Sequence, residues 1–152
     1  MKDFDLYIKF LKECGQFESI TELNCRKVES LRDRIRYTDT TIKGFNKNPL
    51  KFIIYFLNYF DYRYQMYLVT KQNKVIGCFA LRNKGKKNVY LYDFTVLPIY
   101  RGKGYSREIL NIIYNLVNDY GKNKLSLYLR RNNSIAYNLY ISEGFKKVKS
   151  QK

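Results

Sequence analysis

The chain has 152 residues, which is the usual size of one domain. It carries 29 Lys and Arg against 13 Asp and Glu, a formal net charge of +16, and 17% of its residues are aromatic although Trp is absent. It also contains no histidine, which excludes Ser–His and Cys–His nucleophile pairs as well as histidine-ligated zinc and haem.

The first third of the chain predicts mainly helices. Residues 4–11 fit two periods, because their apolar positions match both helical spacing and the alternation of a strand. Apolar residues line one face of a predicted helix from Ser19 to Tyr37, and Asn48-Pro49 predicts the start of another helix. The face from 19 to 37 consists of Leu23, Val28, Leu31 and Ile35. We therefore expect residues 1–62 to form a helical N-terminal part.

Strands begin at about residue 65. Two strands separated by a turn at residues 72–74 predict a hairpin, and the next run is apolar almost throughout, as a buried central strand is. The later elements alternate strand, helix, strand, which predicts two parallel strands joined by a right-handed crossover. The expected elements are strands at 65–71, 75–82 and 89–97, a helix at 104–120, a strand at 125–130, a helix at 133–143 and a strand at 145–149.

A glycine-containing turn leads from the central strand into the long helix. Gly102 and Gly104 allow backbone conformations that other residues avoid, and the free amides and dipole at a helix start favour an anion. Arg101, Lys103 and Arg107 add positive charge. The segment matches neither the P-loop nor the dinucleotide-binding fingerprint, so it predicts either a pyrophosphate cradle or a plain strand–helix turn.

A second motif lies between Asn133 and Phe145. Taken alone, Asn133 fits a helix cap, Leu139 a core position and Gly144 a helix stop. Taken with the glycine turn, the chain resembles the GNAT superfamily of N-acetyltransferases over roughly residues 65–148. The first family motif is matched at Val96, Pro98, Arg101 and Gly104, with Ser106 as a mild departure at its last small position, and the second at Asn133, Ala136, Leu139, Tyr140, Gly144 and Phe145.

The resemblance implies one α/β domain spanning residues 1–152, with an acetyl-CoA-binding core at 65–148. Its fold would be a mixed, mostly antiparallel sheet with a central splayed parallel pair, flanked by helices. The chain stops soon after Phe145, so the last strand common in the family is expected to be truncated. Such a gap would leave a sheet edge or cleft wall open, and a second copy of the chain would be able to complete it.

The resemblance also implies the residues of the site. Tyr140 would be the general acid that protonates the CoA thiolate, and Asp93 is the candidate base, with a water chain or unaided proton loss as alternatives. Tyr128 stands where some members of the family carry a glutamate. The implied acetyl-CoA contacts are Phe94, Thr95, Val96, Arg101, Gly102, Lys103, Gly104, Tyr105, Ser106, Arg107, Asn133 and Tyr137.

The predicted function is direct acetyl transfer from acetyl-CoA to a primary amine of a protein N-terminus, a lysine or a small molecule. Two alternatives remain: a weak or inactive CoA-binding module, and an RNA- or ribosome-associated protein that uses its basic surface. The charge itself has a competing cause, because residues with A/T-rich codons make up close to half of the chain. We expect no metal site, no disulfide among Cys14, Cys25 and Cys78, no membrane association and a cytoplasmic protein.

Overall fold

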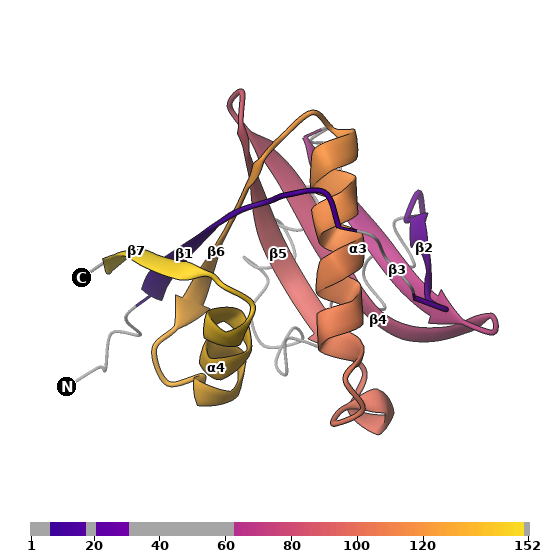
Figure 1. Ribbon diagram of the computed structural model, residues 1–152. Helices are drawn as coiled ribbons and strands as arrows, with labels where there is room; N and C mark the ends of the chain where they lie inside the picture. The colour runs from indigo at the N-terminus through magenta and orange to yellow at the C-terminus, as the bar shows by residue number, and fades with distance from the viewer. Residues whose placement is uncertain (1–6, 18–20, 31–62, 151–152) are drawn as a thin grey trace, which may run out of the picture. The chain divides into compact units, whose positions relative to one another are not determined.

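The computed structural model describes residues 7–17, 21–30 and 63–150 (Figure 1). Their strands form a seven-stranded sheet in the order β2-β3-β4-β5-β6-β1-β7. Strands β5 and β6 pair in parallel, which confirms the predicted α/β class and its mixed sheet with a parallel pair. The elements are β1 (Tyr7–Glu13), β2 (Asn24–Lys27), β3 (Tyr64–Lys71), β4 (Lys74–Lys84), β5 (Asn88–Val96), the 3-10 turn η2 (Pro98–Tyr100), α3 (Tyr105–Asp119), β6 (Lys124–Arg130), α4 (Ser134–Ser142) and β7 (Lys146–Ser150).

The chain divides into two compact units, and each is described by itself. The hairpin unit takes in the described residues 21–30, 63–83 and 91–109. The terminal unit takes in residues 7–17, 84–90 and 110–150 and so contains both ends of the described chain. Strand β5 and helix α3 each contribute residues to both units.

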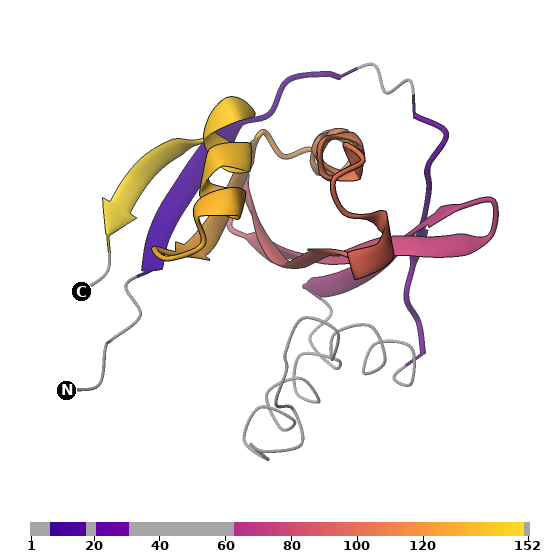
Figure 2. The same ribbon diagram turned by 90° about the horizontal axis from the view of Figure 1, so that it is seen from below.

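The hairpin unit is built on the antiparallel pair β3–β4, which confirms the predicted hairpin (Figure 2). Gln72 and Asn73 form its turn with φ angles of 48° and 63°, a conformation that matches the twist of a tight hairpin. Buried side chains from these strands make a core that includes Met66, Leu68 and Ala80. The runs rich in Tyr, Leu and Val therefore predict the strands, and the polar residues between them predict the turn.

Strand β2 replaces part of a predicted helix. The helix expected from Ser19 to Tyr37 is wrong for residues 24–27, which pair antiparallel with β3 at the edge of the sheet. Leu23 and Val28 are both buried, but five positions apart they flank a short extended segment instead of lining a helix face. The Val28 amide continues the contact by donating to the Met66 carbonyl at 2.8 Å. Residues 21–23 and 28–30 are not helical either, whereas the remainder of that helix and the start predicted at Asn48-Pro49 lie outside the described residues.

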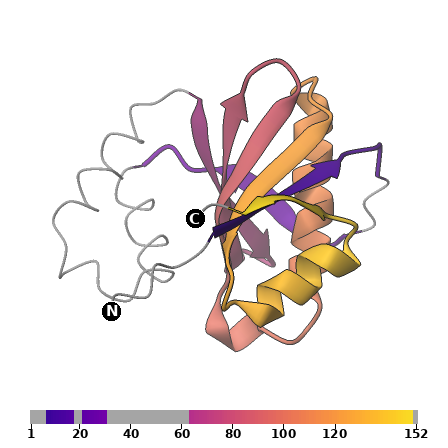
Figure 3. The same ribbon diagram turned by 90° about the vertical axis from the view of Figure 1, so that its left-hand side faces the viewer.

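The terminal unit places the N-terminal strand between two C-terminal strands. Strand β1 pairs antiparallel with β6 on one side and with β7 on the other (Figures 1 and 3). Ile8 and Phe10 are buried there, so the part of the ambiguous segment 4–11 that the structure describes, residues 7–11, is a strand. The place beside β6 is filled by β1 of the same chain, whereas the pairing with a second copy stays a prediction.

Helices α3 and α4 begin and end close to their predicted limits. Helix α3 buries an apolar stripe that includes Leu110, Ile113 and Val117, as its helical periodicity predicts. Helix α4 begins after Asn133, and Gly144 at φ +83° follows its end. Neither helix has the length and apolar character needed to cross a membrane, a finding that applies to the described residues.

Candidate active site

The turn between β5 and α3, residues 97–107, is here called the Gly loop. Gly102 and Gly104 have φ angles of +74° and +81°, which residues other than glycine adopt only with backbone strain. No atom lies within 4 Å of the point where a Cβ would stand on either residue, so the space beside both is open. Residues 101–104 are exposed, and their backbone is therefore available to a ligand.

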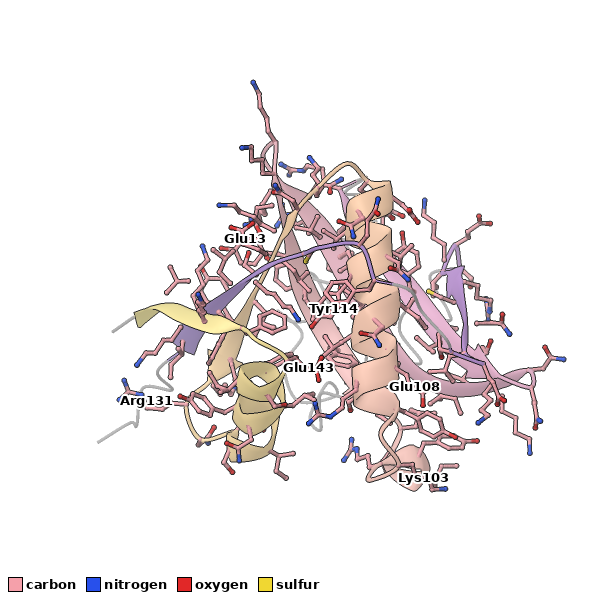
Figure 4. All side chains as sticks on the ribbon, in the orientation of Figure 1. Glu13, Lys103, Glu108, Tyr114, Arg131 and Glu143 are labelled. Atoms are coloured by element: carbon pink, nitrogen blue, oxygen red, sulfur yellow. The ribbon has the colours of Figure 1, made fainter. Side chains whose placement is uncertain are left out.

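Positive charge surrounds this loop, and one of its cations also braces it. The Arg101 Nε donates to the Val96 carbonyl at 2.9 Å, which ties the loop back to the end of β5. Lys103, labelled in Figure 4, lies over the Tyr100 ring with its Nζ 5.8 Å from the ring centre. Glu108 in the first turn of α3 accepts a hydrogen bond from the Thr21 hydroxyl at 3.0 Å. The loop thus presents exposed backbone and cations at a helix start, as a pyrophosphate requires.

The end of β5 is shaped by a close approach to β4. A Cβ on Gly77 would lie 2.4 Å from the Thr95 carbonyl oxygen, so only glycine fits at that point of β4. The amide of Leu97 also donates to the Ile76 carbonyl at 2.8 Å. Thr95 and Val96 are buried and Phe94 is half-buried. The strand that leads into the Gly loop is therefore held rigidly against its neighbour.

Asp93, the predicted base, lies in the hairpin unit. Its φ is +52°, an uncommon backbone conformation for a residue with a side chain. Its Oδ2 accepts a hydrogen bond from the Tyr64 hydroxyl at 2.5 Å, and Tyr64 is buried. The carboxylate is thus fixed by one strong partner within its own unit.

Tyr140, the predicted acid, lies in the terminal unit among other aromatic rings. Its ring centre is 5.1 Å from that of Phe145 and 6.3 Å from that of Phe10. Only 6% of Tyr140 is exposed, and this burial raises the pKa of its phenol above the usual value. The hydroxyl is therefore protonated at neutral pH, as an acid must be before it reacts.

Two other residues of the second motif lie on the same helix. The Asn133 Oδ1 accepts a hydrogen bond from the Ala136 amide at 3.2 Å, so Asn133 caps α4. Tyr137 is half-buried and meets Phe10 edge-on, with ring centres 5.6 Å apart. The cap is the role that Asn133 has in the described residues, and its contact with a cofactor stays a prediction.

Lys12 fixes the C-terminal end of α4. Its Nζ donates to the Glu143 carbonyl and lies 4.2 Å from the centre of the Tyr114 ring, with Phe17 and Phe145 close by (Figure 4). Loss of water around this amine lowers the pKa of Lys12, although the charge of Glu143 acts against the shift. This cation among aromatic rings joins β1 to the helix that carries Tyr140. Sequence reasoning missed it because Lys12 is 131 residues from its partner.

A pair of tyrosines lies on the sheet of the terminal unit. Tyr90 of β5 and Tyr128 of β6 stack with ring centres 5.5 Å apart and planes 17° from parallel, and their hydroxyls are 3.5 Å apart. The amines of Lys9 and Lys84 lie 5.2 Å and 5.3 Å from the centre of the Tyr90 ring. The sequence pointed to Tyr128 through the family resemblance, but nothing in it singled out Tyr90 or Lys9.

The structure groups the predicted site residues in two sets. The Gly loop, residues 94–96 and Asp93 belong to the hairpin unit, whereas Asn133, Tyr137 and Tyr140 belong to the terminal unit. In the described part of the chain, no group of three or more Cys, Asp or Glu is arranged to hold a metal ion. All three cysteines are free, and burial raises the pKa of Cys14 to about 11 and that of Cys25 and Cys78 to about 12.

Comparison with known proteins gives consistent similarities. The family model for the acetyltransferase (GNAT) family matches residues 17–145. A [ribosomal protein bS18]-alanine N-acetyltransferase of Haemophilus ducreyi is 30% identical over 83 residues, which cover 55% of this chain and 57% of that relative. The chain therefore matches little more than half the length of this curated relative.

Solved structures share the fold at low identity. A functionally unknown conserved protein of Staphylococcus epidermidis superposes with a TM-score of 0.76 at 14% identity, over 95% of this chain and 58% of that one. A predicted acetyltransferase of Clostridium acetobutylicum, solved with acetyl-CoA, superposes with a TM-score of 0.62 at 16% identity, over 84% of this chain and 92% of that one. At these identities the structures establish the fold alone.

Proposed function

The chain belongs to the acetyltransferase (GNAT) family, and from that premise we propose that it transfers the acetyl group of acetyl-CoA directly to a primary amine. The amine nitrogen attacks the thioester carbonyl, a C–N bond forms, and the C–S bond breaks. The CoA thiolate then takes a proton from the enzyme. No cysteine takes part, because burial disfavours the thiolate of all three.

The observation that carries the proposal is the environment of Tyr140. Its buried ring packs against Phe10 and Phe145, and Lys12 and Asn133 contact the two ends of the helix on which it lies. A neutral phenol is suited to donate a proton to a thiolate as the leaving group departs. We therefore assign Tyr140 as the general acid.

The open, cationic Gly loop supports acetyl-CoA as the donor. We propose that the pyrophosphate rests on residues 101–107, of which 101–104 are exposed, with Arg101, Lys103 and Arg107 adding charge. The pantetheine arm would pair with the backbone of residues 94–96, and Asn133 and Tyr137 would contact the same arm. The solved structure of the Clostridium acetobutylicum protein with acetyl-CoA is consistent with this donor.

The acceptor we propose is the α-amine of a protein, with a lysine or a small amine as alternatives. The curated relative is named for alanine acetylation of a ribosomal protein, and similarity over part of its length supports this class. The net charge of +16 favours an acceptor with acidic residues near the amine. For the proton of the amine, Asp93 stays a candidate acceptor.

The test is acetyl transfer to a panel of peptides that differ in their first residue, with a lysine peptide and a small amine alongside. Tyr140→Phe keeps the ring that contacts Phe10 and Phe145 but lacks the proton, so we expect kcat to fall about 100-fold or more while acetyl-CoA still binds. Tyr67→Phe, which removes the hydroxyl of a buried tyrosine stacked on Phe79 and outside the proposed site, is the matched control. If wild type and Tyr140→Phe are equally inert although both bind acetyl-CoA, the chain is a binding module and the enzymatic proposal fails.

A further inference from the structure

We propose that the tyrosine pair Tyr90–Tyr128 receives the proton that the amine releases, with the amines of Lys9 and Lys84 placed over the Tyr90 ring. The inference rests on the proposed function and deepens it, because it names the base of the same reaction. All four residues belong to the terminal unit, as does the proposed acid Tyr140.

The position of the pair in the sheet is the first argument. The parallel ladder between β5 and β6 comprises three residue pairs and ends at Tyr90 and Ser126. Tyr128 is two residues further along β6 and therefore projects on the same face as Ser126. The pair thus stands where the two parallel strands stop pairing, and the family resemblance expects the pantetheine arm where these strands splay apart.

The division of the sheet into two faces is the second argument. Lys9 is opposite Tyr128 in the β1–β6 ladder, so both project on the face that carries Tyr90. Phe10 is opposite Leu127 and projects on the other face, where it contacts Tyr140. An acid and a base on opposite faces of β1 and β6 would reach the leaving sulfur and the entering nitrogen from opposite directions.

The charges around Tyr90 are the third argument. Lys9 from β1, Lys84 from β4 and Tyr128 from β6 all face its ring. Burial acts to raise the pKa of Tyr90, but hydrogen bonds from Lys9 and Tyr128 and the charges of both lysines outweigh it, so the pKa is lowered. A lowered pKa makes a phenol better suited to act as a general base.

Exposure gives the two tyrosines different roles. Tyr90 is only 7% exposed, whereas Tyr128 is 39% exposed and is the member that an acceptor would meet first. The Tyr128 hydroxyl would take the proton from the amine as it passes its own proton to the Tyr90 phenolate. The balance is complete: one proton moves from nitrogen to Tyr90, and another moves from Tyr140 to the sulfur.

The experiment compares Tyr90→Phe and Lys9→Met with wild type in acetyl transfer across pH. We expect Tyr90→Phe to lower kcat about 100-fold while the KM for acetyl-CoA stays unchanged. Wild-type kcat should rise with pH up to the pKa of Tyr90. Lys9→Met removes one cation, so the same rise should occur at higher pH. Tyr67→Phe, which is buried against Phe79 in the hairpin unit, is the matched control and should keep the wild-type profile.

A second readout does not depend on activity. In protein labelled with 13C at the tyrosine Cζ, one resonance should titrate below the usual tyrosine pKa of about 10. That resonance should vanish in Tyr90→Phe and titrate at higher pH in Lys9→Met. Failure to find it, or an unchanged pH profile in Tyr90→Phe, overturns the inference.

The outcomes separate the inference from the proposed function. A wild type that transfers acetyl groups while Tyr90→Phe keeps its kcat and Asp93→Asn loses it makes Asp93 the base and overturns only this inference. A wild type that transfers no acetyl group to any acceptor overturns the proposed function and the inference with it. Loss of activity in Tyr90→Phe with a raised KM for the amine but the wild-type pH profile makes Tyr90 a binding residue and also overturns the inference.

Discussion

The Gly loop and the segment from Asn133 to Phe145 differ in what they offer a ligand, exposed backbone in the first and buried side chains in the second. The Gly loop consists of exposed backbone whose shape depends on residues without side chains at Gly102 and Gly104. The segment from Asn133 to Phe145 depends on buried rings around Tyr140 and on contacts at both ends of α4. A site that binds an anion needs accessible backbone N–H groups, whereas a site that donates a proton needs a hydroxyl that is protonated and shielded from water. A substitution that adds a side chain should therefore impair the Gly loop, whereas one that removes a side chain should impair the segment from Asn133 to Phe145.

The largest effect is expected where the backbone of the hairpin unit is tightest. Gly77→Ala places a Cβ 2.4 Å from the Thr95 carbonyl, and because backbone cannot move aside as a side chain can, we expect a loss of about 3 kcal/mol in the free energy of unfolding. Denaturant unfolding measures it. Gly15→Ala, which meets no atom within 4 Å, is the control. Equal stability of the two variants would contradict the close approach.

The next effect concerns the Tyr64–Asp93 hydrogen bond. Tyr64→Phe leaves the carboxylate without its partner at 2.5 Å, so we expect a loss of about 2 kcal/mol in unfolding free energy at neutral pH. Asp93→Asn in the Tyr64→Phe background should recover part of the loss, because a neutral amide is cheaper to leave unpaired. A double-mutant cycle measured by urea unfolding tests the coupling, and strictly additive losses would refute it.

A smaller effect separates stability from binding in the Gly loop. Gly104→Ala and Gly85→Ala both place a side chain at positive φ, +81° and +72°, with open space around it, so each should lose about 1 kcal/mol of stability. Only Gly104→Ala should also weaken acetyl-CoA binding. We expect the Kd to rise about tenfold, which corresponds to a loss of about 1.4 kcal/mol in binding free energy. Calorimetric titration measures the affinity. Equal binding by both variants would remove the loop from the cofactor site.

The smallest effect tests the two roles predicted for Asn133. Asn133→Ala removes the cap of α4 and should lower the free energy of unfolding by about 1 kcal/mol, which thermal unfolding measures. Asn133→Ser keeps a capping oxygen and should recover the stability. If the KM for acetyl-CoA also returns to the wild-type value in Asn133→Ser, the residue is a cap alone. If only stability returns, the amide contacts the cofactor as the resemblance implies.

Local signals account for most of what the sequence predicted. The turn at Gln72 and Asn73, the start of α3 after Gly104 and the end of α4 at Gly144 all follow from residues within a few positions of the feature. What the sequence did not predict comes from distant partners. The place of β1, the contact of Lys12 with the end of α4 and the stacking of Tyr90 on Tyr128 join residues 38 to more than 100 positions apart. No periodicity or spacing encodes such pairs.

The place of β1 between β6 and β7 has a consequence for how the chain is made. Residues 7–13 pair with residues 124–130 and 146–150, so more than 100 residues are synthesised between β1 and either of its partners. The apolar side chains of Ile8 and Phe10 therefore stay without these neighbours until β6 and β7 have emerged, and β1 cannot join the sheet before then. The stability of β1 therefore depends on β7, because β1 loses one of its two neighbouring strands whenever β7 is missing.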